Sequence, residues 1–322
     1  MTMLEDDVVL QFTAMASQVT VRVLDPTLDP APAMASVEAI FRDIERSCTR
    51  FDPASDLMRA NAQPEAWTTV APSCLAAIEL AYAAYRRTGG AFDPRVLRTL
   101  TAMGYDRSLN FAGGDVHTTG SPLPAMGQAQ PWTPEFDVDA SRVRLGTDPI
   151  DLGGIGKGYA VRRGIEALAG LGRSALVEAG GDLATYGDGP VRPDGEKRAW
   201  RAAVEDPRGA DGPIAVIDAS DTAVATSSLK LRSWRSGGRD VHHLIDPRTG
   251  HPATAGLASV TVVDADPAWA EVWTKAAFLE GAQGIRTFVA QKGLAAMWVD
   301  ESGSVGHSAS LRDRIIWEAP HA

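Results

Sequence analysis

Cysteine is almost absent from this chain of 322 residues, which has only Cys48 and Cys74. Both fall in apolar patterns typical of helices, so we expect two buried, reduced thiols, with a disulfide as the alternative. Long hydrophobic runs are absent as well. No apolar stretch approaches about 20 residues, so neither a transmembrane helix nor membrane insertion is expected. The length allows a large core, in one large domain or in two lobes.

Positive charge is also scarce, because 41 acidic residues outnumber 31 lysines and arginines and give a net charge of −10. Such a charge repels the phosphates of nucleic acids and of anionic membranes, so neither is an expected partner. The N-terminal sequence Met-Thr-Met-Leu-Glu-Asp-Asp is acidic where a secretory signal would be basic. Together with the two thiols, this pattern predicts a cytoplasmic protein.

Apolar periodicity predicts an α+β fold with mixed, largely antiparallel sheets and flanking helices. Alternating residues over 8–24 indicate two strands or one bent strand, and Ser36 is expected to cap a helix. Residues 50–61 are expected to form a polar loop or short turn. A helix is expected between Pro72 and Gly89. Further helices are expected over 157–169, 269–279 and 285–291, and further strands over 175–177, 259–263 and 295–299. Four more strands are expected in one antiparallel sheet, over 200–204, 214–217, 224–226 and 241–245.

The sequence Ile-Asp-Leu-Gly-Gly-Ile-Gly-Lys-Gly over residues 150–158 is the most informative segment. Glycines around Lys157 let backbone N–H groups approach an anion closely. The helical pattern that follows places these groups at a helix N-terminus, where negative charge is favoured. A P-loop needs glycine where Asp151 lies and Ser or Thr where Gly158 lies, so that motif is excluded. We therefore expect a phosphate-binding loop of another kind.

Polar clusters elsewhere in the chain carry the remaining candidate chemistry. Besides 150–158, they are residues 50–61, 89–94, 179–182 and 242–250. Taken singly, each has a structural interpretation. The glycine pair at 89–90 fits a helix C-cap, and Asp-Pro-Arg-Thr-Gly at 246–250 fits a β-turn.

In this order and spacing the clusters resemble the ApbE family, the FAD:protein FMN transferases, over residues 15 to about 281. The matching motifs are Ser to Asn (55–61), Gly-x-Phe-Asp (90–93), Asp-Leu-Gly-Gly-Ile-x-Lys-Gly-Tyr-Ala (151–160), Ala-Gly-Gly-Asp (179–182), Ala-Thr-Ser (225–227) and His-x-Ile-Asp-Pro-x-Thr-Gly (243–250). The resemblance implies a single two-lobed domain over residues 1–322. Residues 106–135, rich in Gly, Pro and Ser, would form a long surface loop between the lobes.

The resemblance implies an enzyme that moves the FMN moiety of FAD onto a Ser or Thr hydroxyl of an acceptor flavoprotein, with Mg²⁺ as cofactor and AMP as product. Lys157 would act as a point charge on the diphosphate. His243 would orient or deprotonate the acceptor hydroxyl, because its unperturbed pKa lies near neutrality. Simple core packing of Met15 and a strand hydrogen bond of His243 are the structural alternatives. The FAD-binding residues implied are Met15, Ala91, Phe92, Asp93, Asp151, Lys157, Gly180, Gly181, Asp182, Thr226, Ser227 and Ile245.

The implied metal site departs from the family pattern. Its ligands would be the Gly154 carbonyl, an Asp and a Thr, but Glu271 and Lys275 stand at the last two positions. Glu271 is still a hard oxygen donor, whereas the Lys275 ammonium only donates hydrogen bonds and repels a dication. Thr274 lies one residue early, which on a helix is a rotation of about 100°. Glu271 and Lys275 also have the i,i+4 spacing of an ordinary ion pair.

Two interpretations of that departure lead to different functions. In the first, Lys275 supplies the positive charge that a metal supplies elsewhere, and Lys157, His243, Glu271 and Lys275 are the catalytic residues of an FMN transferase. In the second, the site is degenerate and the protein binds FAD without catalysis. An FAD pyrophosphatase, in which water replaces the acceptor hydroxyl, is a further alternative.

Overall fold

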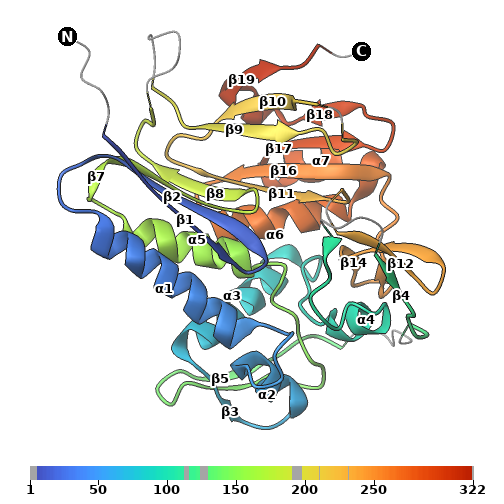
Figure 1. Ribbon diagram of the computed structural model, residues 1–322. Helices are drawn as coiled ribbons and strands as arrows, with labels where there is room; N and C mark the ends of the chain where they lie inside the picture. The colour runs from blue at the N-terminus through green and yellow to red at the C-terminus, as the bar shows by residue number, and fades with distance from the viewer. Residues whose placement is uncertain are drawn as a thin grey trace, which may run out of the picture.

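The computed structural model describes residues 6–111, 116–123, 130–190, 198–209, 211–230 and 232–320. Its α+β architecture is built on an eight-stranded sheet in the order β1-β2-β7-β8-β11-β16-β17-β18, in which all neighbouring strands are antiparallel (Figure 1). These strands are β1 (Asp7–Ala14), β2 (Ser17–Pro26), β7 (Gly172–Ala179), β8 (Asp182–Tyr186), β11 (Ala223–Ser228), β16 (Leu257–Asp264), β17 (Ala295–Asp300) and β18 (Val305–His307). The predicted fold class is therefore confirmed.

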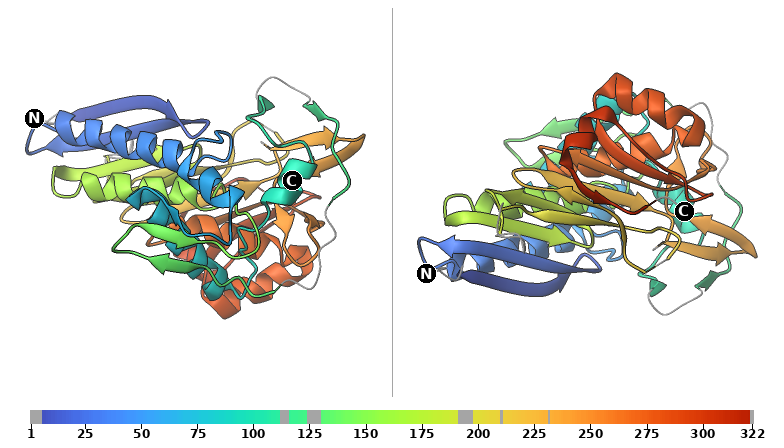
Figure 2. Two further views of the ribbon diagram at one scale, coloured as in Figure 1. Left: turned by 90° about the horizontal axis from the view of Figure 1, so that it is seen from below. Right: turned by 90° about the horizontal axis from the view of Figure 1, so that it is seen from above.

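Helices α1, α5 and α6 run along one face of this sheet, as the view from below in Figure 2 also shows. In α1, Val37, Phe41 and Ile44 are buried at the spacing of an amphipathic helix. They share one hydrophobic core with Val21 of β2 and Val177 of β7. The helices are α1 (Ala31–Cys48), α2 (Asp56–Ala62), α3 (Pro72–Thr88), α4 (Leu97–Ala102), α5 (Gly156–Ala167), α6 (Pro267–Phe278), α7 (Gly281–Lys292) and the 3₁₀ helix η2 (Ala309–Arg314).

A three-stranded sheet, β19-β10-β9, covers the opposite face (Figure 2, view from above). Trp200, directly before β9, and Ile217 of β10 share a second core with Val224 and Val263 of the large sheet. Smaller sheets pair β13-β12-β4, β14-β15 and β3-β6-β5. The bounds of these strands are β3 (Thr68–Thr69), β4 (His117–Thr118), β5 (Glu135–Asp137), β6 (Arg142–Arg144), β9 (Arg201–Glu205), β10 (Pro213–Asp218), β12 (Ser233–Ser236), β13 (Arg239–His242), β14 (Ile245–Asp246), β15 (His251–Pro252) and β19 (Ile315–Glu318).

The helix boundaries follow local chemistry, with one correction. Helix α3 ends as predicted at Gly89, whose φ of +65° suits glycine at a C-cap. Helix α6 starts after Asp266, which accepts hydrogen bonds from the N–H groups of the first turn. The prediction that Ser36 caps a helix is wrong. Helix α1 already begins at Ala31, because Pro32 is tolerated in a first turn, and the Ser36 hydroxyl donates to the Pro32 carbonyl at 3.0 Å.

Two further predictions need correction. Residues 50–61 are more than a loop, since Ser55 caps the short helix α2 by accepting from the Met58 N–H at 3.1 Å. The four strands predicted for one antiparallel sheet belong to different sheets. β9 and β10 lie in the sheet β19-β10-β9, β11 lies inside the large sheet, and 241–245 divides between β13 and β14. Long-range pairing, which a local pattern does not encode, decides this assignment.

The segment 106–135, predicted as a long surface loop, is described in part, since residues 112–115 and 124–129 lie outside the described residues. Its described part contains β4, which pairs in parallel with β12. Phe111 and Val116 pack against the buried cluster that includes Trp234, and Trp132 near the end of the segment is buried. Among the helices described, none has the length and apolar character needed to cross a bilayer.

Candidate active site

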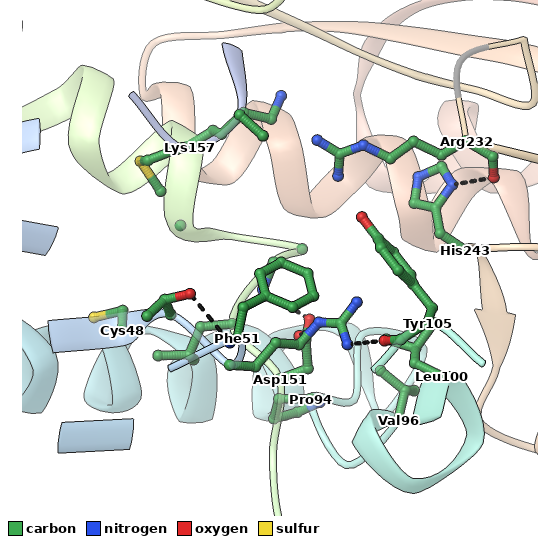
Figure 3. Close-up of a pocket in the computed structure, with 18 of the residues that line it drawn as sticks. Cys48, Phe51, Pro94, Val96, Leu100, Tyr105, Asp151, Lys157, Arg232 and His243 are labelled. Atoms are coloured by element: carbon green, nitrogen blue, oxygen red, sulfur yellow. Dashed lines mark hydrogen bonds and ion pairs between the residues drawn. The ribbon is translucent and has the colours of Figure 1, made fainter. Parts of the chain in front are cut away.

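A cavity of about 610 Å³ lies where the β1–β2 turn, the N-terminus of α5 and residues 243–245 converge (Figure 3). This volume is within the range of roughly 300–1,000 Å³ that is typical of small-molecule sites. Part of its wall is apolar and aromatic, with Phe51, Phe92 and Tyr105, and part is charged. Of the residues predicted from the sequence, the lining includes Met15, Ala91, Phe92, Asp93, Asp151, Gly154, Lys157, His243, Ile245 and Lys275.

The turn between β1 and β2 brings Met15 to the cavity. Met15 and Ala16 have left-handed φ values of 52° and 56°, as a tight two-residue hairpin turn requires. The Met15 N–H donates to Glu45 of α1 at 2.7 Å, which anchors the turn. A Cβ added to Gly156 would lie 3.3 Å from the Met15 methyl carbon, so this side chain covers the glycine loop.

The glycine loop is fixed by side chains from the N-terminal half. The Asn61 amide donates to the Ile150 carbonyl and accepts from the Ile150 N–H, both at 2.8 Å. One Asp151 oxygen accepts from the Gly153 N–H at 2.8 Å. The other pairs with Arg50 Nε at 2.9 Å, and both side chains are almost fully buried. The Asp151 carboxylate therefore holds the turn through Gly153 and Arg50.

Arg50 lines the cavity and belongs to the polar cluster 50–61, but it was not among the predicted binding residues. Its guanidinium carbon lies 4.3 Å from the ring centroid of Phe51 and 4.1 Å from that of Tyr105, within cation–π distance. It also donates to the Tyr105 carbonyl. An arginine beside a phenylalanine was visible in the sequence, but Tyr105 is remote along the chain, so no local signal connected them.

Lys157, the second residue of α5, forms an ion pair with Asp182 at the start of β8. Asp182 is 1% exposed and also accepts from the Thr226 N–H at 3.3 Å. This contact joins the two glycine turns that the sequence singled out. A lysine at the cavity wall, already oriented by a buried carboxylate, is placed to meet an anionic ligand.

The second glycine turn lies behind this lysine, and its members are not among the described residues that line the cavity. Gly180 packs against Ser17, whose hydroxyl would lie 2.5 Å from an added Cβ. The Gly181 N–H donates to Glu178 at 2.7 Å. Thr226 contacts Thr261 at 2.9 Å. The predicted FAD contacts of Gly180, Gly181, Asp182, Thr226 and Ser227 stay predictions.

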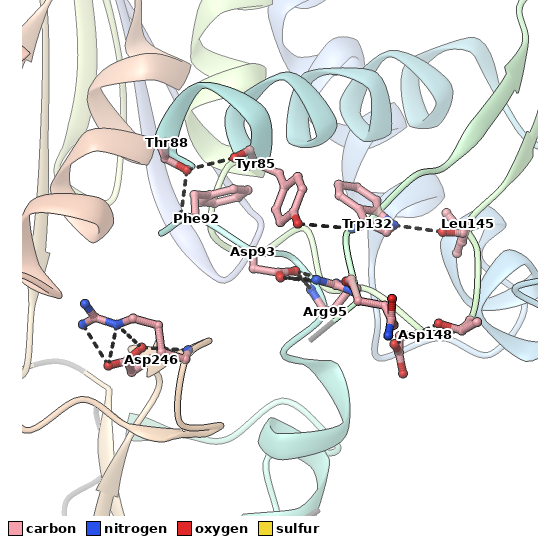
Figure 4. Close-up of polar contacts among 12 residues, drawn as sticks. Tyr85, Thr88, Phe92, Asp93, Arg95, Trp132, Leu145, Asp148 and Asp246 are labelled. Carbon is pink, nitrogen blue, oxygen red and sulfur yellow. Dashed lines mark hydrogen bonds and ion pairs between the residues drawn. The ribbon is translucent and has the colours of Figure 1, made fainter. Parts of the chain in front are cut away.

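The segment after α3 is held rigidly at the cavity (Figure 4). The Phe92 N–H donates to the Thr88 hydroxyl at 2.9 Å. Asp93 forms an ion pair with Arg95 at 2.7 Å, with both side chains about 90% buried. In the same region the Tyr85 hydroxyl accepts from the Trp132 N–H at 3.2 Å. Asp93 is thus committed to Arg95 through its carboxylate.

One ring nitrogen of His243, Nε2, has no hydrogen-bond partner among the described residues. Its Nδ1 lies 3.3 Å from the Arg232 carbonyl (Figure 3), and a carbonyl only accepts, so Nδ1 carries the proton. Nε2 then holds a lone pair. Burial lowers the pKa of His243 well below its ordinary 6.5, and the charges of Arg232 and Lys275 lower it further. The neutral imidazole is therefore the favoured form at neutral pH.

The adjacent His242 has no free nitrogen. Its Nε2 donates to the Ala253 carbonyl at 2.9 Å, and its Nδ1 accepts from the Leu244 N–H at 3.2 Å. Of the two adjacent histidines, His243 is therefore the one with a nitrogen free for proton transfer.

The implied magnesium site does not fit these residues. One Glu271 oxygen accepts from the Gly158 N–H at 2.8 Å, and the other pairs with Lys275 Nζ at 3.3 Å. The Lys275 side chain lies against Gly154, with Cε 3.2 Å from an added Cβ. Thr274 is turned away and bonds Ser227 at 2.7 Å. An ammonium thus occupies the place where a dication would need a ligand.

Fold and site together define an α+β protein whose cavity combines aromatic side chains with lysines and a neutral histidine. The chain belongs to the ApbE family, whose family model matches residues 15–298. This match covers the motifs and all of the cavity lining except Thr13 and Ala14.

Individual relatives agree with this assignment. The crystal structure of the ApbE protein from Thermotoga maritima is 29% identical, covers 96% of this chain and 99% of its own, and superimposes with a TM-score of 0.80. The flavin transferase ApbE from Vibrio cholerae, 20% identical over 97% of this chain and all of its own, shares the fold with a TM-score of 0.74. The FAD:protein FMN transferase of Treponema pallidum is 26% identical over 312 residues, 88% of this chain and 82% of its own length. The FAD:protein FMN transferase of Klebsiella pneumoniae is 30% identical over 156 residues, which are 48% of this chain and 43% of that protein.

Proposed function

We propose that this protein is an FAD:protein FMN transferase, with FAD as donor substrate and a Ser or Thr hydroxyl of an acceptor flavoprotein as the second substrate. One observation carries the proposal. A single cavity combines an aromatic wall, the oriented ammonium of Lys157 and the free Nε2 of His243. The names of the Treponema and Klebsiella relatives, which specify this reaction, support it.

The proposed ligand uses both parts of the cavity. A flavin ring suits the wall formed by Met15, Phe92 and Tyr105, because flat aromatic groups pack favourably against such side chains. The diphosphate suits the cationic part, where Lys157 and Lys275 lie together with the guanidinium of Arg232. FAD carries an apolar ring system and two phosphates in one molecule, so it matches this division.

The proposed step is an in-line phosphoryl transfer. The acceptor oxygen attacks the phosphorus on the FMN side, while the bond from that phosphorus to the bridging oxygen breaks and AMP leaves with the electron pair. The hydroxyl proton passes to Nε2 of His243, and the Arg232 carbonyl holds the resulting imidazolium through Nδ1–H. Lys157 compensates the charge that develops on the phosphates.

A flavinylation assay tests the proposal. The purified protein is incubated with FAD and a protein extract of its source, freed of small molecules, and covalent flavin is detected by fluorescence after denaturation and by mass spectrometry. We expect a protein that gains one FMN unit, with release of AMP and strong loss in a His243→Asn variant. FMN and AMP formed equally without extract would indicate the pyrophosphatase, and FAD recovered intact would indicate a binding protein.

The proposal includes a cytoplasmic location. Cys48 and Cys74 are both free and buried, as expected for a compartment that keeps thiols reduced. Fractionation of source cells with an antibody against the protein would test this, and recovery outside the cytoplasmic fraction would contradict it.

A further inference from the structure

Lys275 stands at the position where the family resemblance places a metal ligand, and the structure shows how it is held there. Its ammonium lies 3.3 Å from Oε1 and 3.2 Å from the backbone carbonyl of Glu271, one helical turn earlier in α6. Its aliphatic carbons pack on Gly154, with Cε and Cδ within 3.3 Å of an added Cβ. The side chain is only 18% exposed and lines the cavity.

Glu271 is fully engaged by the protein. Its side chain is 3% exposed, its second oxygen accepts from the Gly158 N–H at 2.8 Å, and its backbone carbonyl also accepts from the Thr274 hydroxyl at 2.7 Å. The lone pairs that remain on the Glu271 carboxylate therefore face the Lys275 ammonium at close range. A dication that entered here would have to displace Lys275 first, at the cost of a buried ion pair.

The ammonium keeps one hydrogen for a ligand. It has three N–H donors, and the backbone carbonyl and Oε1 of Glu271 accept two of them. The third has no acceptor among the described residues. Lys157 and His243 line the same cavity, so a phosphate held by Lys157 lies within the field of Lys275. Arg232 adds a guanidinium without an ion pair or hydrogen bond to any described residue.

Resting on the proposed function, we propose that Lys275 takes the place of a divalent cation, so that this protein transfers FMN without metal. The Lys275 ammonium donates to the diphosphate and stabilises the charge on the departing AMP. The two lysines and Arg232 together supply the compensation that a dication supplies at other phosphoryl-transfer sites. Glu271 is a positioning residue, because it orients the ammonium and does not contact the reacting atoms.

The decisive experiment measures flavinylation by the wild-type protein after EDTA treatment and with added Mg²⁺. We expect equal rates in both conditions. Transfer only with Mg²⁺ would overturn the inference and leave the proposed function standing. Absence of transfer in both conditions, with FAD intact, would contradict the proposed function itself.

Variants separate the charge of Lys275 from its packing. Lys275→Met keeps the aliphatic bulk, and we expect a loss of about 100-fold in transfer rate, similar to the loss of one strong oxyanion donor. Because this variant leaves a buried carboxylate unpaired, Glu271→Gln with Lys275→Met serves as a second form with a neutral pair. We expect the same loss in both, while Lys292→Met on exposed α7 matches wild type. Wild-type rates in a folded double variant would overturn the inference.

Metal binding provides a readout that does not depend on activity. Mn²⁺ alone is titrated and followed by electron paramagnetic resonance. We expect no site in the wild type and a site in Glu271→Asp with Lys275→Thr, which recreates the family's ligand types. The same double variant should show flavinylation that EDTA abolishes. Stoichiometric Mn²⁺ binding by the wild-type protein would contradict the replacement of the metal by Lys275.

Discussion

At the scale of single residues, protonation of His243 decides the pH range of the proposed reaction. Its pKa lies well below 6.5, first because of burial and then because of the nearby positive charges of Arg232 and Lys275. A base acts in its unprotonated form, so a lowered pKa extends activity toward acid. We expect kcat/KM to stay constant as the pH falls through 6.5 and to decline only below it. The measurement is a pH profile of flavinylation.

The variant His243→Asn tests whether protonation of His243 causes this decline at acid pH, the acid limb of the profile. In His243→Asn the rate should fall by about 100-fold or more, and the acid limb should disappear. FAD binding should persist, because the imidazole is not assigned to the phosphates. An acid limb centred at or above pH 6.5 in the wild-type protein would contradict this account of His243.

Arg232 is the second residue-scale prediction. Its guanidinium projects into the cavity (Figure 3), while its backbone carbonyl holds His243. A charge-assisted hydrogen bond to phosphate contributes about 1.5–3 kcal/mol. We therefore expect Arg232→Met to weaken FAD binding by about 10- to 100-fold in calorimetry. Arg239→Met, on exposed β13, is the control, and equal affinities of the two variants would refute a phosphate contact.

At the scale of elements, the close approach of α5 and α6 explains one glycine of the loop. A Cβ on Gly158 would lie 2.5 Å from the Pro267 carbonyl oxygen and 2.7 Å from Ala268 Cα, both backbone atoms that cannot rotate away. Gly156 faces only the flexible end of Met15, at 3.3 Å. We expect Gly158→Ala to lower the free energy of unfolding by about 1–3 kcal/mol.

Gly156→Ala is the matched control for that change. It lies in the same helix, α5, and alanine favours a helix over glycine by about 1 kcal/mol, so stability should be unchanged or slightly raised. Urea denaturation of the two variants is the measurement. Equal destabilisation by both would show that the helix contact is not what requires glycine at position 158.

The β1–β2 turn is the second element with a testable cost. Ala16 has a φ of 56°, a conformation that costs an L-residue about 1–2 kcal/mol. Glycine removes this strain but loses about 0.5–1 kcal/mol in chain entropy. Ala16→Gly should therefore raise the free energy of unfolding by about 0.5 kcal/mol. Urea denaturation of both variants is the measurement. In Ala14→Gly, within β1, we expect the free energy of unfolding to fall. A fall in Ala16→Gly as well would contradict the strain argument.

At the scale of the whole molecule, the sequence specified local features better than long-range neighbours. The Pro72 start and Gly89 end of α3 were predictable because proline and glycine act locally. The place of β11 between β8 and β16 was not, since those partners are remote in the chain. The cavity follows the same rule. Lys157 and His243 belong to motifs, whereas Tyr105 and Arg232 reach the cavity only through tertiary packing.

The cavity is built by residues between Thr13 and Leu279, so a ligand there bridges elements from most of the chain. Binding to the native state alone stabilises it by about 2.7 kcal/mol at a ligand concentration 100 times Kd. We therefore expect FAD to raise the midpoint of one cooperative thermal transition, with or without EDTA. AMP and riboflavin each occupy part of the cavity and should give smaller shifts. A second transition that FAD leaves unmoved would contradict the single cooperative unit, because some elements would then unfold independently of the ligand that joins them.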